Sequence, residues 1–227
     1  MKTMKTKKNR KKIYYRIYYV IMFLPLIVTL ATLPFLPEQI PAHYGFDNKV
    51  DRWGSKYEAL LYPIVTILMG YFMLAMAKWG ARQEEGGENN EKVLTAAGIV
   101  TMVVFNVLNA CALYSDYNRV EDLSSVPINI FQLLFGLMGA FMIIIGNIMP
   151  KLRMNSLIGL RTKWSMKDEA TWKKSQRFGG ITSIIGGIAV IVICCLTKGM
   201  SCFWYNMGVI AVLLVVDVCY TRKIARS

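Results

Sequence analysis

The chain alternates between long apolar runs and shorter polar segments. Six apolar runs cover residues 17–36, 58–79, 93–114, 128–149, 179–197 and 203–221. A run of about 20 residues forms a helix long enough to cross a ~30 Å hydrocarbon core. These runs are apolar on all sides, whereas a surface helix of a soluble domain has one apolar face. The pattern therefore predicts an all-α integral membrane protein with six transmembrane helices.

Lys and Arg are concentrated in alternate loops. Of the 27 such residues, 22 lie in residues 1–16, 78–92 and 150–178 and in the tail after Thr221. Because basic segments remain on the cytoplasmic side of a membrane, this distribution predicts that both termini are cytoplasmic. The net charge of +13 is then a topology signal and an attraction to anionic lipids, and it does not indicate direct nucleic-acid binding.

The same topology divides the chain into five parts. The first apolar run is too long for a cleaved signal peptide, and Pro34-Phe35-Leu36-Pro37 is a poor cleavage site, so this run is expected to remain as helix 1. The parts are a basic cytoplasmic arm (1–16), helices 1 and 2 with an outer loop at 37–56 (17–79), an acidic inner connector with helix 3 and an outer loop (80–127), helices 4–6 with a cytoplasmic loop at 150–180 (128–221), and a cytoplasmic tail (222–227).

Three polar residues inside the spans need partners. Asn106 and Asn109 are three positions apart and therefore lie on one face of span three. Amides in lipid form hydrogen bonds to neighbouring helices, and we favour that role over a ligand pathway. Asp217 is the one acid well inside a span. It either pairs with Arg222 or Lys223, which we favour, or marks a functional site.

Helix-breaking and small residues indicate how the spans pack. Pro25 lacks an amide proton, so it is expected to kink span one, with Thr29 and Thr32 available to satisfy the freed backbone groups. Small residues let helix backbones approach closely, and they predict a packed hairpin of spans four and five. These residues are Gly136, Gly139, Ala140 and Gly146 in span four and Gly179, Ser183 and Gly187 in span five, with Gly180 and Gly186 alongside.

The five cysteines do not match the spacing of a metal or redox motif. Most are expected to serve as small buried apolar residues. A bond between Cys195 and Cys202 on the outer side is a minor alternative.

The outer loop is a structured, aromatic-rich segment. It reads P-E-Q-I-P-A-H-Y-G-F-D-N-K-V-D-R-W-G-S-K over residues 37–56, and Asp47-Asn48 predicts a turn within it. Exposed aromatic side chains beside charges are typical of recognition surfaces. The residues expected on this surface are His43, Tyr44, Phe46, Asp47, Asp51, Trp53 and Lys56.

His43 is the only histidine of the chain, and two interpretations of it stay open. With Asp47 and Asp51 it could form a metal or proton site if all three side chains converge. Alternatively, these side chains cap turns and pair with Arg52 and Lys56. We favour the second interpretation and assign no metal.

The cytoplasmic loop has its own folding signals. It reads N-S-L-I-G-L-R-T-K-W-S-M-K-D-E-A-T-W-K-K-S-Q-R-F-G-G over residues 155–180. Ser165 with Asp168 three positions later has the form of a capping box, which predicts a short interfacial helix starting near Met166. Gly179-Gly180 either ends this helix or provides a close contact at the head of span five.

Two tryptophans flank this predicted helix start. Trp164 and Trp172 are expected to anchor the helix at the membrane interface. Glu169 and Lys173 are four positions apart with the acid first, which is the favourable order for a helix pair.

The loop also carries the pattern G-[IL]-R-T-x-W-[ST]-x-K-D-E-x-x-W-x-K-[ST]-x-R-x-x-G over residues 159–180. This pattern resembles the signature of the SdpI family, bacterial multi-spanning membrane proteins named for an immunity protein. Members commonly have Pro at the position of Lys163 and His at the position of Gln176. The outer-loop pattern beginning P-x-H-[WFY] is similar to a second motif that often accompanies the first in SdpI-like proteins.

The resemblance implies a membrane immunity protein that protects the producing bacterium against a secreted antimicrobial peptide toxin, which the outer loop would bind. A role that can coexist is a receptor that holds a cytosolic transcriptional repressor at the membrane. The residues expected to dock this partner are Arg161, Thr162, Trp164, Lys167, Asp168, Glu169, Trp172, Lys173 and Arg177.

The alternative function is a membrane enzyme or transporter that acts on an anionic or lipid-linked substrate. Arg161, Lys163, Asp168, Glu169 and Arg177 would form its polar cluster, since guanidinium groups suit phosphate. However, the sequence has no phosphate-binding glycine loop, no H-E-x-x-H motif and no nucleophile elbow. We therefore assign no catalytic residue and no cofactor.

Overall fold

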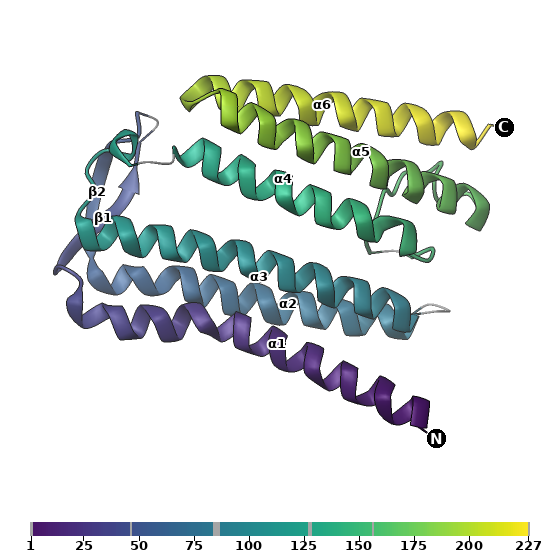
Figure 1. The fold of residues 1–227 in the computed structure, drawn as a ribbon, viewed down its shortest axis with the longest axis horizontal. Coiled ribbons are helices and arrows are strands. Elements are labelled where there is room, and N and C mark those ends of the chain that lie inside the picture. The colour runs from purple at the N-terminus through teal and green to yellow at the C-terminus, as the bar shows by residue number, and fades with distance from the viewer. Residues whose placement is uncertain (1, 46, 84–86, 127–128, 156, 227) are drawn as a thin grey trace. The chain divides into compact units, whose positions relative to one another are not determined.

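The computed structural model describes all residues except 1, 46, 84–86, 127–128, 156 and 227. Six helices in the described part of the chain are long and apolar enough to cross a membrane (Figure 1). They are α1 (Lys2–Thr32), α2 (Leu61–Gln83), α3 (Gly87–Asn118), α4 (Ile130–Ile148), α5 (Glu169–Leu196) and α6 (Gly199–Ile224). The prediction of six transmembrane helices is confirmed, and the protein is a multi-pass cell membrane protein.

Some elements differ from the predicted ones. α1 begins at Lys2, so residues 2–16 of the segment expected as a basic arm are helical. The predicted outer loop contains an antiparallel pair of strands, β1 (Gln39–Tyr44) and β2 (Val50–Ser55), which the all-α prediction did not include. Short 3₁₀ helices lie at Leu33–Phe35, Lys56–Leu60, Leu123–Ser125 and Met149–Lys151.

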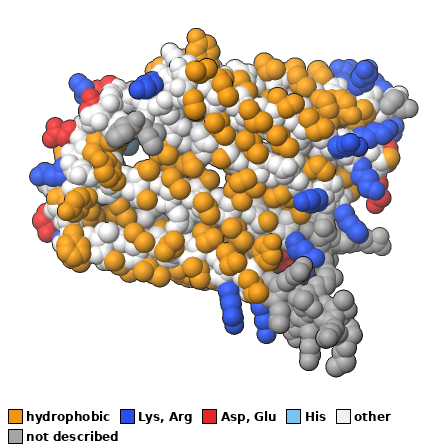
Figure 2. Space-filling model, in the orientation of Figure 1, with side chains coloured by type: hydrophobic (Ala, Val, Ile, Leu, Met, Phe, Trp, Pro, Cys, Tyr) orange, Lys and Arg blue, Asp and Glu red, His pale blue; other side chains and the backbone are white. Residues whose placement is uncertain are grey.

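Apolar side chains face outward along the helices. On the face drawn in Figure 2, hydrophobic side chains cover the helices, whereas charged side chains gather toward the helix ends. In α6, Val212, Leu214 and Val215 are each more than 60% exposed. Lipid tails solvate such side chains as well as a protein core does, so this distribution is the one that a membrane-spanning bundle needs.

The chain forms two compact units. One contains residues 1–75 and 95–126, and the other contains residues 76–94 and 127–227. In the first unit, the core is built from Tyr18, Met22, Leu74 and Met102, so α1 packs against both α2 and α3. The Tyr18 hydroxyl donates a hydrogen bond to the carbonyl of Gly70 at 2.8 Å, which joins α1 to α2.

The two asparagines of α3 both bond to α1. Nδ2 of Asn106 donates to the carbonyl oxygen of Ile21 at 2.9 Å. Nδ2 of Asn109 donates to Oγ1 of Thr29 at 3.2 Å, and both of these side chains are buried. The favoured role of the asparagines, hydrogen bonding between helices, is therefore confirmed.

The carbonyl freed by Pro25 has a different partner from the predicted ones. Pro25 lies inside α1 and cannot donate to the carbonyl of Ile21, four residues earlier. Asn106 supplies that hydrogen bond, whereas Thr32 donates to carbonyls of its own last turn and Thr29 bonds to α3. The side chain of Asn106 in α3 thus makes the hydrogen bond that the threonines of α1 were expected to make.

In the second unit, α4 and α5 pack closely through glycines. A Cβ atom added to Gly139 would lie 2.8 Å from the carbonyl oxygen of Gly187, and one added to Gly180 would lie 2.6 Å from that of Gly146. The predicted hairpin of spans four and five is confirmed, with Gly187 and Gly180 as the glycines of α5 that meet the glycines of α4. The two glycine contacts lie seven residues apart on each helix. A Cβ atom added to Gly136 would meet no atom within 4 Å.

Candidate functional site

The hairpin, residues 39–55, is held by backbone pairing and a hydrogen-bonded turn. Gln39 pairs with Ser55 and Tyr44 with Val50, and the register shifts near His43. The turn predicted at Asp47-Asn48 is present. Asn48 has a φ of 64°, and the carboxylate of Asp47 accepts a hydrogen bond from the backbone N–H of Lys49 at 3.2 Å. Phe46, expected on this surface, lies outside the described residues.

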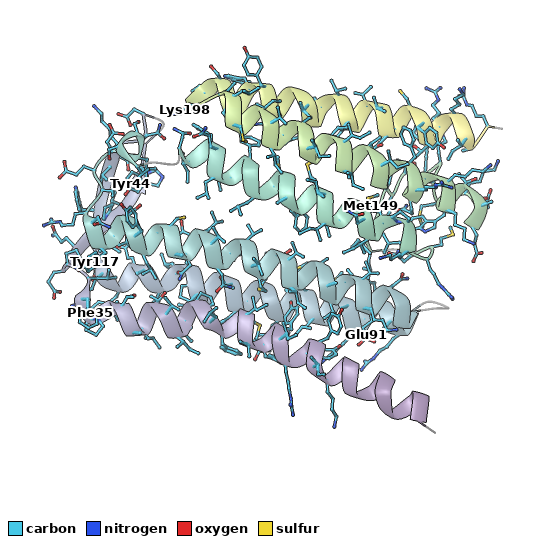
Figure 3. The ribbon with its side chains drawn as sticks, in the orientation of Figure 1. Phe35, Tyr44, Glu91, Tyr117, Met149 and Lys198 are labelled. Carbon is cyan, nitrogen blue, oxygen red and sulfur yellow. The ribbon has the colours of Figure 1, made fainter. Side chains whose placement is uncertain are left out.

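The hairpin is anchored to the segment that follows α3. The backbone N–H of Val50 donates to the carbonyl of Glu121 at 2.9 Å, and the Tyr44 hydroxyl donates to the carbonyl of Val120 at 2.8 Å (Figure 3). Burial raises the pKa of this phenol. The guanidinium of Arg119 lies 5.3 Å from the ring centre of Trp53, a cation–π contact. The hairpin is therefore a fixed element.

Charged residues form separate pairs around the hairpin. Nδ1 of His43 lies 2.6 Å from a carboxylate oxygen of Asp51, and both side chains are more than half exposed. Arg52 pairs with Glu58 at 2.8 Å, and Lys56 pairs with Glu38 at 2.8 Å. The expectation that Arg52 and Lys56 pair with His43, Asp47 or Asp51 is wrong, because they pair with Glu58 and Glu38 instead.

The alternative metal interpretation gains no geometric support. The carboxylates of Asp47 and Asp51 both lie near Gly45. A Cβ atom added to Gly45 would lie 2.9 Å from an oxygen of Asp47 and 3.4 Å from an oxygen of Asp51. However, Asp47 bonds to the backbone of Lys49, and Asp51 bonds to His43. Over the described residues, no group of three His, Cys, Asp or Glu side chains is placed to hold a metal ion.

The second candidate region is the signature segment, residues 150–180. The short interfacial helix predicted from Met166 is absent, because residues 163–166 form a turn and α5 begins at Glu169. Asp168 is the N-cap of α5, and its carboxylate accepts a hydrogen bond from the backbone N–H of Thr171 at 2.7 Å. This N–H group holds the pKa of Asp168 below its ordinary value. Helix α5 then continues through Gly179-Gly180 without a break.

Ser165 stabilises the turn instead of capping a helix. Its hydroxyl oxygen accepts a hydrogen bond from the backbone N–H of Thr162 at 2.8 Å, and Oγ1 of Thr162 accepts one from the backbone N–H of Ser165 at 3.0 Å. Thr162 also bonds through Oγ1 to Oγ1 of Thr221 in α6 at 3.1 Å. The turn is thereby joined to the end of α6, and Thr162 has a structural role.

Trp172 is a core residue of the signature segment. It is 1% exposed and packs with Val93, Met149 and Leu152. Its indole N–H donates to the carbonyl of Leu152 at 3.0 Å. Trp172 is therefore unavailable as an interfacial anchor or as a docking residue, contrary to both expectations. This packing against α3 and against the chain before α5 could not be read from the spacing of the two tryptophans.

Gln176 clamps the backbone of the loop. Its Oε1 accepts from the backbone N–H of Leu160 at 2.9 Å, and its Nε2 donates to the carbonyl of the same residue at 3.0 Å. Gly159 has a φ of 111°, and an added Cβ would collide with the Gln176 amide. Asn155 supports the same loop, since its Oδ1 accepts from the backbone N–H groups of Leu157 and Ile158 at 2.8 Å.

The remaining predicted docking residues lie on the surface of this framework. Trp164 is half-buried, with the charged groups of Lys163 and Arg222 at 5.0 Å and 5.9 Å from its ring centre. Nζ of Lys167 donates to the carbonyl of Ala225 at 2.8 Å. The exposed members of the predicted set are Arg161, Lys167, Asp168, Glu169, Lys173 and Arg177.

Asp217 bonds to a threonine rather than to a cation. Its Oδ1 accepts from Oγ1 of Thr182 in α5 at 2.8 Å, and no ion pair joins it to Arg222 or Lys223 in the described chain. The favoured pairing is therefore wrong. Asp217 and Asp168 therefore bond to separate partners.

Several residues that build these regions were not identified from the sequence. Glu38 and Glu58 hold the cations of the hairpin base, and Arg119 contacts Trp53. Gln176 was noted only as a departure from a family pattern. Its two hydrogen bonds to the backbone of Leu160 show that it holds the loop in place. Opposite charges flanking the strands were the one available signal.

The comparisons with known proteins agree with the resemblance. Residues 151–221 match the SdpI/YfhL protein family, and residues 20–67 match a domain of unknown function, DUF1648. The chain is 26% identical over 177 residues to Immunity protein SdpI of Bacillus subtilis (strain 168). The aligned region covers 77% of this chain and 78% of that protein. No solved structure matches the chain. The chain is therefore similar to SdpI/YfhL proteins over residues 151–221, which contain nearly all of the signature segment, the rest of α5 and most of α6.

Proposed function

We propose that this protein is a membrane immunity protein that protects a bacterium against a secreted antimicrobial peptide toxin. The observation that carries the proposal is the similarity to Immunity protein SdpI, which extends over about three quarters of both chains. Because 177 aligned residues exceed the family region 151–221, the similarity includes further parts of the membrane bundle.

The proposed topology places the hairpin outside the cell and the signature segment in the cytoplasm. Three spans separate these two regions in the sequence, and an odd number of crossings puts them on opposite sides of the membrane. The positive-inside rule assigns the signature segment, with its eight Lys and Arg over residues 150–178, to the cytoplasm. A toxin arriving from outside would meet the hairpin first.

The hairpin offers a recognition surface of fixed geometry. Trp53 is 36% exposed, and the His43–Asp51 pair lies on the same exposed hairpin. Anchoring through Val120 and Glu121 means that little backbone ordering has to accompany binding. Aromatic side chains in such surfaces contribute most of the binding energy. We therefore assign toxin recognition to Trp53, with His43 and Asp51 as its polar neighbours.

Expression of the gene in a toxin-sensitive bacterium tests the proposal. The unaltered protein should raise the toxin concentration needed to stop growth, and Trp53→Ala should remove most of that protection at equal membrane levels. Trp79→Ala is the matched control, because Trp79 is also exposed but lies at the cytoplasmic end of α2 in the proposed topology. Full protection by the Trp53→Ala protein would refute the assigned surface, and no protection by the unaltered protein would refute the function.

We also propose that the signature segment docks a cytosolic transcriptional repressor. The support is its exposed charged face, which includes Lys173 and Arg177 and rests on the buried Trp172 and Gln176. The same cations suit anionic lipid headgroups of the inner leaflet. Affinity purification from membranes, before and after toxin addition, should recover a DNA-binding regulator, and Lys173→Glu with Arg177→Glu should abolish its recovery. The absence of any regulator in both states would remove this role.

A further inference from the structure

Two cysteine thiols face each other at the turn that joins α5 to α6. Cys194 lies in the last turn of α5 and Cys202 in the first turn of α6, with the turn around Lys198 between the two helices (Figure 3). Their sulfur atoms are 3.7 Å apart, and both side chains are buried. Cys195, the partner considered from the sequence, is exposed. The helix geometry therefore selects Cys194 over its neighbour.

The surroundings of the two sulfurs hold them in this arrangement. Nδ2 of Asn206 donates to the carbonyl of Cys202 at 2.9 Å and lies 3.4 Å and 3.6 Å from the sulfurs of Cys202 and Cys194. On the other side, Nε2 of Gln132 donates to the carbonyl of Cys194 at 2.7 Å. The backbone next to each thiol is thus anchored by an amide side chain from a helix.

We propose that Cys194 and Cys202 form a disulfide bond that closes the α5–α6 turn. The sulfurs would need to approach from 3.7 Å to about 2.05 Å, a movement that rotation about the Cα–Cβ bonds supplies. In the proposed topology this turn faces the outside of the cell, where disulfides persist because the cytosolic reductants are absent. The bond is independent of toxin recognition and rests only on the orientation of the chain.

The oxidant is a protein disulfide of an extracytoplasmic thiol oxidoreductase. One cysteine thiolate attacks that disulfide to form a mixed disulfide and release one oxidant thiol. The second cysteine thiolate then attacks the mixed disulfide, which forms the Cys194–Cys202 bond and releases the second oxidant thiol. In the net reaction two electrons and the two cysteine protons pass to the oxidant, which leaves as a dithiol. Because Cys202 is 0% exposed in the folded protein, the reaction precedes the packing of α6 onto α5.

Differential alkylation of the full-length protein tests the bond. Cells are quenched in acid and dissolved in SDS with N-ethylmaleimide, so that burial protects no thiol. The protein is then reduced, treated with deuterated N-ethylmaleimide and analysed by peptide mass spectrometry. Cys194 and Cys202 should carry the deuterated label in most molecules, and Cys111, Cys195 and Cys219 should carry the light one. Light label on both Cys194 and Cys202 would overturn the proposal.

Two variants identify the partners. Cys194→Ser should leave Cys202 with the light label, because its partner is missing. Cys195→Ser is the matched control and should leave the deuterated label on Cys194 and Cys202 unchanged. A shift of Cys202 to the light label in Cys195→Ser would assign the bond to the neighbouring cysteine and refute the pairing. Labelling of the unaltered protein gives an answer even if a variant fails to fold.

Discussion

Nδ2 of Asn106 in α3 lies 2.9 Å from the carbonyl oxygen of Ile21 in α1, the carbonyl that Pro25 leaves without a helical partner. An unbonded carbonyl in the hydrocarbon region has no water to satisfy it, so its free-energy cost is high. The same Nδ2 also donates to the carbonyl of Met102 at 2.7 Å. A kink-forming residue in one helix and a polar residue in another therefore form one structural unit.

This relationship predicts a coupling between the two residues. Asn106→Leu should lower the free energy of unfolding by about 1 kcal/mol, the usual size of a hydrogen bond between membrane helices. In a Pro25→Ala background, where the new backbone N–H restores the helical hydrogen bond, the same substitution should cost much less. Thermal unfolding of the four proteins in detergent measures the coupling. Equal costs in both backgrounds would show that Asn106 does not compensate for Pro25.

The glycine contacts between α4 and α5 predict a position-dependent effect of a methyl group. Gly139→Ala should destabilise the protein by about 1–3 kcal/mol, because the added carbon would meet the carbonyl of Gly187 at 2.8 Å. Gly136→Ala on the same helix is the matched control and should be neutral or stabilising, since its surroundings are open. Apparent melting temperatures compare the two, and equal values would contradict the packing.

The Gln176 clamp predicts a graded series of substitutions. Gln176→Leu leaves the backbone N–H of Leu160 without its partner and should cost about 1–3 kcal/mol. Gln176→His should cost less, because a neutral imidazole has one donor nitrogen and one acceptor nitrogen. Lys173→Gln, an exposed change on the same helix, should stay within about 0.5 kcal/mol. Limited proteolysis of residues 150–168 would report the loosening, and an intact loop in Gln176→Leu would contradict the clamp.

The N-cap of α5 predicts a pH dependence. The pKa of Asp168 is held below its ordinary value of 3.8, so the folded state favours the ionised carboxylate. Its contribution to stability is present above pH 3.8 and is lost as the pH falls through the lower folded-state pKa. Asp168→Asn keeps a capping oxygen without the titration, so its melting temperature should fall less between pH 5 and about pH 2 than that of the unaltered protein. An equal fall in melting temperature for the two proteins over this pH range would contradict the role of Asp168 as a charged N-cap.

The proposed orientation predicts which engineered cysteines react in intact cells. In a background without native cysteines, Asn48→Cys should react with a membrane-impermeant maleimide, because Asn48 lies in the turn of the hairpin. Lys174→Cys should react only after the cells are permeabilised, because Lys174 is exposed on the signature segment. Labelling of Lys174→Cys in intact cells, with Asn48→Cys labelled only after permeabilisation, would show that the hairpin is cytoplasmic and the signature segment is outside.

Composition and periodicity were sufficient for the membrane-spanning architecture. Long apolar runs have one stable form in lipid, because a helix satisfies its own backbone hydrogen bonds. The same logic correctly predicted that Asn106 and Asn109 would bond to another helix, since lipid offers no other partner. It could not say which helix, because sequence spacing gives the face of a residue but not the neighbour of that face.

Local signals were less reliable where several polar residues compete. Ser165 and Asp168 both suit an N-cap, and only the packing of Trp172 under the loop decides in favour of Asp168. The hairpin was expected only as a structured loop, and its anchoring to Glu121 and Val120, far away in the sequence, could not be predicted from local signals. At both places long-range contacts complete the structure, and residue spacing does not reveal them.

The amino-acid sequence by itself determined the number of membrane spans, the turn at Asp47-Asn48 and the resemblance of residues 151–221 to the SdpI/YfhL family, because each depends on local pattern. Only the tertiary structure decided the partners of Arg52, Trp172 and Asp217, and the glycine pairs of α4 and α5. Those contacts join residues that are distant along the chain or have several equally plausible neighbours. Which of these contacts form depends on how the helices and loops pack. The spacing of residues along the chain does not show which distant residues come together.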